Sequence, residues 1–267
     1  MGNKGLRFFG TDYCEAALGG TATASSNISF AEFAFDGLIG TKWTSDGEDT
    51  NGDDIFLEMD FGSNRTLDSF FVYGTNIEDV EVQYYDGADW VTCNASIATI
   101  VKSADLAYLF VKLDSEVTTQ KVRVAGGDTI TADQEKYVTL FRAFAEIGQF
   151  EYFPGFSPRI PPKQNVFSTT DGRGFVIERG EQFTAKIKFK SHVSQADIDI
   201  AEELIALKIP FFIWPNGGDE DVFTFSFKPY RFNDIFKVAI VGPSMSELTK
   251  NYYKGGYNNT INLIEVV

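Results

Sequence analysis

Residues 54–61 decide the fold of the first half of the chain; they are Asp54-Ile55-Phe56-Leu57-Glu58-Met59-Asp60-Phe61. Apolar residues stand at every odd position, whereas Glu58 and Asp60 stand at even positions together with Phe56. Side chains of a β-strand point alternately to its two faces. This alternation therefore predicts a strand with one buried and one exposed face.

Further strand-like runs surround this stretch and are separated by turn residues. Asp86-Gly87 is a strong hairpin signal, because Gly readily adopts the backbone conformation that a tight hairpin turn needs. We expect no helix before residue 152. The sequence thus predicts an all-β sandwich for residues 1–152, with further strands over residues 67–73, 80–85, 90–93, 108–113, 121–124 and 137–150.

The composition agrees with a folded, β-rich protein. Of the 267 residues, 43% are hydrophobic and 23% are charged, which is ordinary for a globular chain. The 15% of aromatic residues, including 26 Phe, favour strands. No apolar run approaches the ~18 residues of a membrane span, and no secretory signal is recognised after Met1.

The negative charge lies in one half of the chain. Residues 1–152 hold 10 Lys and Arg against 25 Asp and Glu, whereas residues 153–267 hold 13 of each. An acidic first half would repel phosphates, so we expect no nucleic-acid partner. A neutral second half suits a surface that packs against other protein.

A proline-rich segment separates the two halves. Residues 153–165, FPGFSPRIPPKQN, hold four of the 8 prolines and are expected to form a semi-rigid spacer. Residues 166–267 are expected to be an α+β domain, a β-sandwich with one flanking helix over residues 194–208. Ser194 is the expected N-cap, and Asp197 lies in the positively polarised first turn.

Four motifs in the first half resemble the discoidin, or coagulation-factor C-type, domain. They are Phe33-Ala34-Phe35-Asp36-Gly37 with Thr41-Lys42-Trp43-Thr44-Ser45, the strand 55–62, the strand and hairpin 80–90, and the closing run 140–147. Together they extend over about residues 22–150. The resemblance implies an eight-stranded jelly roll of the galactose-binding type.

The same resemblance implies a structural calcium site beside the first motif. Asp36 and Glu146 would be the ligands, with Thr41 and neighbouring carbonyls as further oxygens, which suits a cation that prefers six to eight oxygen ligands. Alternatively, Asp36 caps a tight turn and Glu146 lies at an exposed strand end. The acidic loop 46–54 contains D-x-N-x-D from Asp49, but Asp54 stands where an EF-hand loop requires Gly, so a solvated loop is favoured over a second cation site.

The sequence favours binding over catalysis. His192 is the only histidine, and no nucleophile, phosphate-binding or zinc motif is present, so we expect no enzyme. By the resemblance to the discoidin domain, Trp43 and Trp90 fall at family positions that are more often core than sugar platform. Cys14 and Cys93 are expected to be free thiols.

The second half resembles structural domains of tailed bacteriophages, especially tail-tip and baseplate proteins of the distal-tail type. The motifs are 209–215 with the glycine-rich acidic turn that follows, Tyr230-Arg231, and the closing strand 261–266. This resemblance implies a virion structural protein of a phage tail or baseplate, made in the host cytoplasm without a signal peptide. Its partners would be other copies of the chain, neighbouring tail proteins and host surface glycans. The alternatives are a free carbohydrate-binding or adhesion protein and an accessory module of a glycoside-active enzyme.

Overall fold

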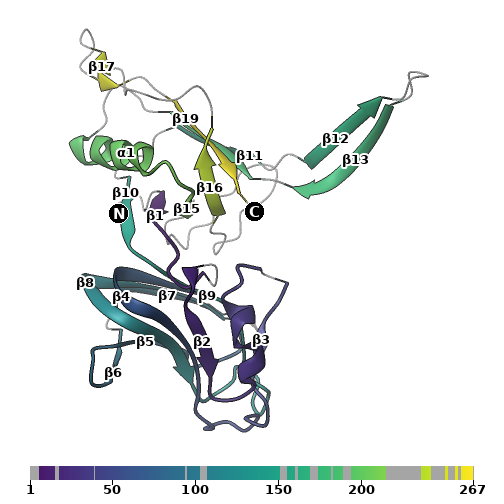
Figure 1. Cartoon of the computed structure of the whole chain (residues 1–267), viewed down its shortest axis with the longest axis vertical. Helices are drawn as coiled ribbons and strands as arrows, with labels where there is room; N and C mark the ends of the chain where they lie inside the picture. Colours follow the sequence, from purple (N-terminus) through teal and green to yellow (C-terminus); the bar gives the residue numbers. More distant parts are fainter. Residues whose placement is uncertain are drawn as a thin grey trace. The chain divides into compact units, whose positions relative to one another are not determined.

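The computed structural model describes residues 6–15, 18–38, 40–93, 95–102, 107–150, 155–159, 162–168, 174–181, 183–188, 194–214, 236–241, 250–251, 256–257 and 260–266. The chain divides into two compact units (Figure 1). Gly10–Glu146 form the first, which we call the sandwich unit, and Met1–Phe9 with Ile147–Val267 form the second unit.

The sandwich unit is an antiparallel arrangement of eight strands. They are β2 (Thr21–Ala24), β3 (Trp43–Thr44), β4 (Ile55–Thr75), β5 (Glu81–Tyr85), β6 (Trp90–Thr92), β7 (Ala95–Lys102), β8 (Ala107–Gly126) and β9 (Tyr137–Phe144). The hydrogen-bonded order is β3-β9-β4-β8-β5-β6, with β2 joined to β4 and β7 to β8. A 3-10 helix, η2 (Ile28–Ala34), lies between β2 and β3 in the chain. The sequence did not predict η2, because its 7 residues are too few for a helical period to show.

Two long strands build both layers of the sandwich. Residues 55–60 of β4 pair with residues 121–126 of β8, while β2 and β5 flank them. Residues 69–75 of β4 pair with residues 107–112 of β8, while β9 and β7 flank them. The register of the β4–β8 pair shifts between Asp60 and Arg65, and Gly62 in this interval has a φ of 70°. Such irregularities let a strand bend from one layer into the next.

The predicted alternation in residues 54–61 is confirmed. Ile55, Leu57, Met59 and Phe61 are buried, and they belong to the same core cluster as Phe70 and Phe141 from the other half of the unit. One hydrophobic core between two layers is the architecture of a β-sandwich. The fold is mainly β, and the sandwich unit has the expected jelly-roll character.

The hairpin predicted at Asp86-Gly87 is also confirmed, because β5 and β6 pair across it. Gly87 has a φ of 106°, which only Gly adopts readily. The Asp86 carboxylate accepts hydrogen bonds from the backbone N–H groups of Ala88 and Asp89, both at 2.8 Å.

The second unit contains a seven-stranded sheet of order β10-β1-β15-β16-β19-β14-β11. Its strands are β1 (Arg7–Phe9), β10 (Glu146–Gln149), β11 (Gly155–Arg159), β14 (Thr184–Lys188), β15 (Phe211–Trp214), β16 (Phe236–Ile240) and β19 (Thr260–Glu265). Two hairpins lie outside this sheet: β12 (Pro162–Ser168) with β13 (Gly174–Glu181), and β17 (Lys250–Asn251) with β18 (Gly256–Tyr257).

The predicted flanking helix is confirmed as α1 (Gln195–Leu207). The Ser194 hydroxyl accepts a hydrogen bond from the Asp197 backbone N–H at 3.1 Å, as an N-cap residue does. Ala201 and Leu204 are buried in the core of the second unit, together with Phe8, Phe211 and Ile261 from its sheet.

The expected domain boundaries differ from those of the structure in three places. The sandwich unit ends at Glu146 rather than at residue 152, because the strand expected over residues 137–150 is divided and its last part, β10, joins the sheet of the second unit. Residues 155–159 of the expected spacer form β11, which pairs with β14, and Pro162 begins β12. Proline lacks an N–H and is tolerated at sheet edges and strand starts, and β11 is an edge strand, so Pro158 does not prevent pairing. In addition, Arg7–Phe9 pair with Phe212–Trp214, so the start of the chain belongs to the second unit.

Candidate functional site

The outer face of one sandwich layer carries polar and aromatic side chains in register. On β4, the inward residues Ile55 and Leu57 are buried, so Phe56 and Glu58 belong to the opposite face. Phe56 pairs with Ala125 of β8, and Glu58 pairs with Arg123. β5 continues these rows, because Glu81 and Gln83 pair with the same two β8 residues.

Arg123 lies at the centre of this face and is held by three neighbours. Its Nε donates a hydrogen bond to Gln83 Oε1 at 2.7 Å, and its guanidinium carbon lies 4.2 Å from the ring centroid of Trp90 and 5.7 Å from that of Phe56. Among the described residues, this is the only hydrogen bond of the Arg123 side chain. Burial lowers the pKa of Arg123, although a guanidinium stays protonated in proteins. A fixed cation with donors to spare is therefore available on this surface.

A pocket of about 420 Å³ lies beside Arg123. Its volume falls within the ~300–1,000 Å³ of typical small-molecule sites. Besides Arg123, it is lined by Asp54, Ile55, Phe56, Asp79, Glu81, Gln83, Ala125 and Gly126. We call it the outer-face pocket.

Two glycines allow carboxylates to approach the backbone at the end of this pocket. A Cβ at Gly126 would lie 2.9 Å from Asp79 Oδ1 and 2.4 Å from the Ile77 side chain. The Asp79 carboxylate accepts hydrogen bonds from the N–H groups of Gly127 at 3.0 Å and Asp128 at 2.9 Å. Asp54 Oδ1 would lie 3.0 Å from a Cβ at Gly127. Within the described part of the chain, the Asp54 carboxylate makes no hydrogen bond or ion pair.

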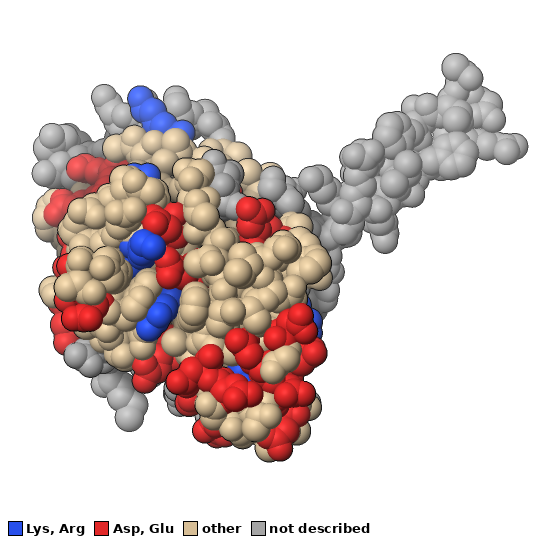
Figure 2. Space-filling view, turned by 60° about the horizontal axis from the view of Figure 1, so that its bottom comes forward, with Lys and Arg blue, Asp and Glu red and all other residues tan. Residues whose placement is uncertain are grey.

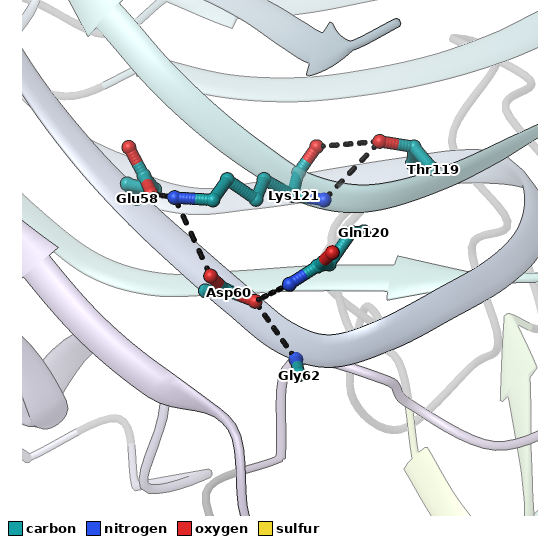
Figure 3. Close-up of polar contacts among 6 residues, drawn as sticks. All are labelled: Glu58, Asp60, Gly62, Thr119, Gln120 and Lys121. Carbon is teal, nitrogen blue, oxygen red and sulfur yellow. Dashed lines mark hydrogen bonds and ion pairs between the residues drawn. The ribbon is translucent and has the colours of Figure 1, made fainter. Parts of the chain in front are cut away.

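A network of charged side chains continues the outer face along β4 and β8 (Figure 3). Lys121 Nζ lies 2.9 Å from Glu58 Oε1 and 3.3 Å from Asp60 Oδ2. Hydrogen bonding to Glu58 is the main cause of the raised pKa of Lys121. Partial burial of Asp60 opposes ionisation, but hydrogen bonds from Gln120, the Gly62 N–H and Lys121 lower its pKa. The charges of Lys121, Glu58 and Asp60 are therefore paired with one another, and this pairing restrains the side chains next to the pocket.

The acidic loop 46–54 is tied to the rest of the unit by a buried ammonium group. Lys136 has no exposed surface, and its Nζ donates hydrogen bonds to the carbonyls of Glu48 and Thr50, both at 2.9 Å. The Asn51 side chain accepts from Thr129 Oγ1 at 2.9 Å. In the described ranges, no group of three or more His, Cys, Asp and Glu side chains could hold a metal ion.

The structure brings together two of the three residues predicted to bind calcium. Thr41 Oγ1 lies 2.7 Å from Asp36 Oδ2, 3.0 Å from the Leu38 carbonyl and 3.4 Å from the Phe33 carbonyl. One hydroxyl has a single proton to donate, so at most one of these acceptors is fully satisfied by it. Asp36 Oδ1 also accepts a hydrogen bond from the Leu38 N–H at 2.7 Å, so Asp36 caps the turn as in the alternative interpretation. Oxygens are the ligands that Ca²⁺ prefers, and a calcium ion at this turn stays a prediction.

Glu146 has a different environment from the one predicted. Its carboxylate forms an ion pair with Lys112 at 3.1 Å, and Lys112 also contacts Asp68. The Glu146 side chain is 5% exposed, so it does not lie at an open strand end either. The Glu146 carboxylate is therefore paired with an ammonium group and is not among the oxygens that surround Thr41.

Exposed apolar side chains cluster on and after η2. Phe30 and Phe33 are 46% and 39% exposed, with ring centroids 5.4 Å apart, and Ile28 and Leu38 are also exposed. This surface is a second aromatic candidate for ligand contact.

Of the two tryptophans that were expected in the core, only Trp43 is fully buried, and its Nε1 donates a hydrogen bond to the Ser26 carbonyl at 3.2 Å.

Several predicted features lie outside the described residues or outside any site. His192 and Tyr230-Arg231 fall in residues that the structure does not describe. Cys14 and Cys93 are free and buried, and burial raises the pKa of Cys93 to about 12.

Arg123 was not predicted from the sequence as a site residue, because its role depends on Gln83 and Trp90 from other strands. The alternation of residues 54–61 offered a signal, since it predicted the outer face.

Comparisons with known proteins give likenesses to solved structures only. No family model and no curated protein matches the sequence. About half of the chain, 51%, is similar to 99% of chitosan-binding module 1 from a chitosanase/glucanase of Paenibacillus sp. IK-5, at 21% identity and a TM-score of 0.39.

Two carbohydrate-binding modules of Clostridium perfringens show similar likenesses. The family 32 module of NanJ, solved with galactose, matches 52% of this chain over 98% of its own, at 15% identity and a TM-score of 0.40. The module CpGH89CBM32-5, solved with GalNAc-β-1,3-galactose, matches 48% of this chain over 97% of its own, at 17% identity and a TM-score of 0.38. Separately, no helix in the described ranges is long and apolar enough to cross a membrane.

Proposed function

We propose that the sandwich unit binds carbohydrate in the outer-face pocket and catalyses no reaction there. This proposal corresponds to the carbohydrate-binding alternative that the sequence left open. The observation that carries the proposal is the position of Arg123, which is fixed by Gln83 and Trp90 beside open carboxylates.

A sugar presents hydroxyl groups that both donate and accept hydrogen bonds. Arg123 supplies donors and no acceptor, whereas the Asp54 and Glu81 carboxylates supply acceptors. Phe56 adds an apolar ring surface to the same pocket. This combination of a few fixed polar groups with an aromatic surface is typical of small-molecule sites. Neighbouring hydroxyls of one sugar ring would accept a hydrogen bond from Arg123 and donate one to a carboxylate of the pocket.

Pre-organisation also supports binding. Arg123 is restrained by its hydrogen bond to Gln83 and by Trp90, so little side-chain entropy remains to be lost when a ligand binds. The Lys121–Glu58–Asp60 network keeps neighbouring charges paired, and the negative charge of Glu58 also attracts its cross-strand partner Arg123.

The test is isothermal titration of the full chain with a panel of neutral and amino-sugar oligosaccharides. We expect binding by at least one of them, and Arg123→Ala weakens it by about tenfold or more, since a charge-assisted hydrogen bond contributes roughly 1.5–3 kcal/mol. Arg65→Ala is the matched control, because Arg65 also lies over an aromatic ring, Tyr13 at 5.6 Å, but does not line the pocket. Equal affinities of the two variants would refute the proposal.

The assembly role of the second unit remains a prediction. Its sequence motifs for a phage tail or baseplate include a glycine-rich acidic turn and Tyr230-Arg231, and both lie outside the described residues. In such a virion, the sandwich unit would present its pocket to glycans on the host surface. As a free adhesion protein, the chain would use the same pocket.

A further inference from the structure

We infer that the glycan bound in the outer-face pocket carries amino groups, and that it is a cationic polymer of amino sugars. This inference rests on the proposed function and adds the chemical class of the ligand. It follows from the charges that line the pocket and from the surface that adjoins it.

Carboxylates outnumber the cation in the pocket. Asp54, Asp79 and Glu81 line it, and Arg123 is the only basic side chain in its lining. In the described part of the chain, none of the three carboxylates forms a salt bridge. Asp79 and Glu81 accept hydrogen bonds only from neutral groups, namely backbone N–H groups, Gln83 and Thr92. The lining therefore has an excess of two negative charges.

This excess selects the sign of the ligand. A uronic or sialic acid would bring a carboxylate to within a few ångströms of Asp54 and Glu81, where like charges repel. A neutral sugar would bond to Arg123 but would gain no attraction from the net negative charge of these exposed carboxylates. A protonated amino group offers three N–H donors and a positive charge, which match Asp54, whose carboxylate has no partner among the described residues.

The surface next to the pocket is negative as well. Asp54 belongs to the loop 46–54 and Asp79 to the loop 76–80, and both loops are bonded to residues 127–133 by backbone and side-chain hydrogen bonds. These three segments carry the acidic residues Asp46, Glu48, Asp49, Asp53, Asp54, Glu78, Asp79, Asp128 and Asp133. Figure 2 shows Asp and Glu gathered at one end of the face displayed. A polymer longer than the pocket would therefore continue over carboxylates.

The two kinds of group in the pocket divide the recognition between them. Arg123, Gln83 and Phe56 suit the hydroxyls and the apolar face that every sugar ring has. Asp54 and Glu81 suit the ammonium group that only amino sugars have. Loss of Arg123 should therefore weaken all sugars, whereas loss of the carboxylates should remove the preference for the amine.

The experiment compares two tetrasaccharides that differ only in N-acetylation. The full chain is titrated with the glucosamine tetrasaccharide and with the N-acetylglucosamine tetrasaccharide, at low and high salt and at a pH where the amine is protonated. We expect the glucosamine oligomer to bind about tenfold or more tightly, with the gap narrowing at high salt because ions screen the attraction. Asp54→Asn and Glu81→Gln should reduce the gap, whereas Asp114→Asn, an exposed carboxylate outside the pocket lining, should leave it unchanged.

Each other outcome overturns the inference in a recognisable way. Equal binding of the two tetrasaccharides, lost in Arg123→Ala, overturns the amino-sugar class and leaves the proposed function standing. Binding of a basic polylysine peptide but of neither tetrasaccharide overturns both and assigns the surface to a cationic protein. Circular dichroism and the melting temperature of each variant show that it is folded, so a loss of binding is not a loss of structure.

Discussion

Lys136 stabilises the loop that supplies Asp54 to the pocket. Its ammonium group is fully buried and bonded to two loop carbonyls, which would lose their partner if it were removed. We expect Lys136→Met to lower the free energy of unfolding by about 2 kcal/mol, because a buried acceptor without a partner costs roughly 1–3 kcal/mol. Urea unfolding measures this change, with the exposed Lys42→Met as control. A variant as stable as the control would show that the loop does not depend on this ammonium.

The pH dependence of stability should contain a contribution from Asp60. Its pKa is lowered in the folded state, so the unfolded chain binds more protons as the pH falls. The contribution is therefore present above the ordinary pKa of about 3.9 and is lost as the pH falls through the lowered value. Asp60→Asn should destabilise the protein at about pH 7, by less than ~1 kcal/mol because the pair is partly exposed, and less so at about pH 3. Equal destabilisation at both pH values would contradict this account.

The two thiols should be inert in the native protein. Burial is the main cause that raises the pKa of Cys14 and of Cys93, the latter to about 12, so little reactive thiolate is present at pH 8. We expect slow reaction with a thiol reagent in buffer and rapid reaction of both residues in denaturant. Rapid modification of the folded chain would show that the core around Cys14 or Cys93 opens readily.

At the scale of elements, the local sequence was sufficient to predict a strand or a hairpin wherever its pattern is complete within a few residues. The alternation of residues 54–61 predicted both faces of the first part of β4, and Asp86-Gly87 predicted the hairpin between β5 and β6. The pairing of Arg7–Phe9 with Phe212–Trp214 had no such signal, because it joins positions about 200 residues apart. The pocket is a product of the same kind of distant pairing, between β4, β5 and β8.

The turn after η2 is the element on which the calcium prediction depends. Asp36, Thr41 and two carbonyls supply oxygens there, so Ca²⁺ bound only by the folded state should raise the melting temperature, by roughly 5 °C. Asp36→Ala should abolish this rise, whereas Asp114→Asn should keep it. Thermal unfolding with and without a chelator makes the measurement. An identical melting temperature in both conditions would remove the metal from the account.

At the scale of the whole molecule, the two halves differ in charge as they do in fold. Residues 1–152 have an excess of 15 acidic residues, whereas residues 153–267 are balanced. We expect the balanced half to assemble, so the full chain should elute with the mass of an oligomer in light-scattering chromatography, and dilution should dissociate it. A monomer at every concentration would contradict the assembly role predicted from the sequence.

The position of a bound sugar tests the central claim most directly. Crystals of the full chain soaked with the oligosaccharide that binds best should show it in the outer-face pocket, with hydroxyls at Arg123 and the ring near Phe56. Density over Phe30 and Phe33 instead, with the pocket filled only by water, would contradict the account and assign sugar binding to the surface around η2.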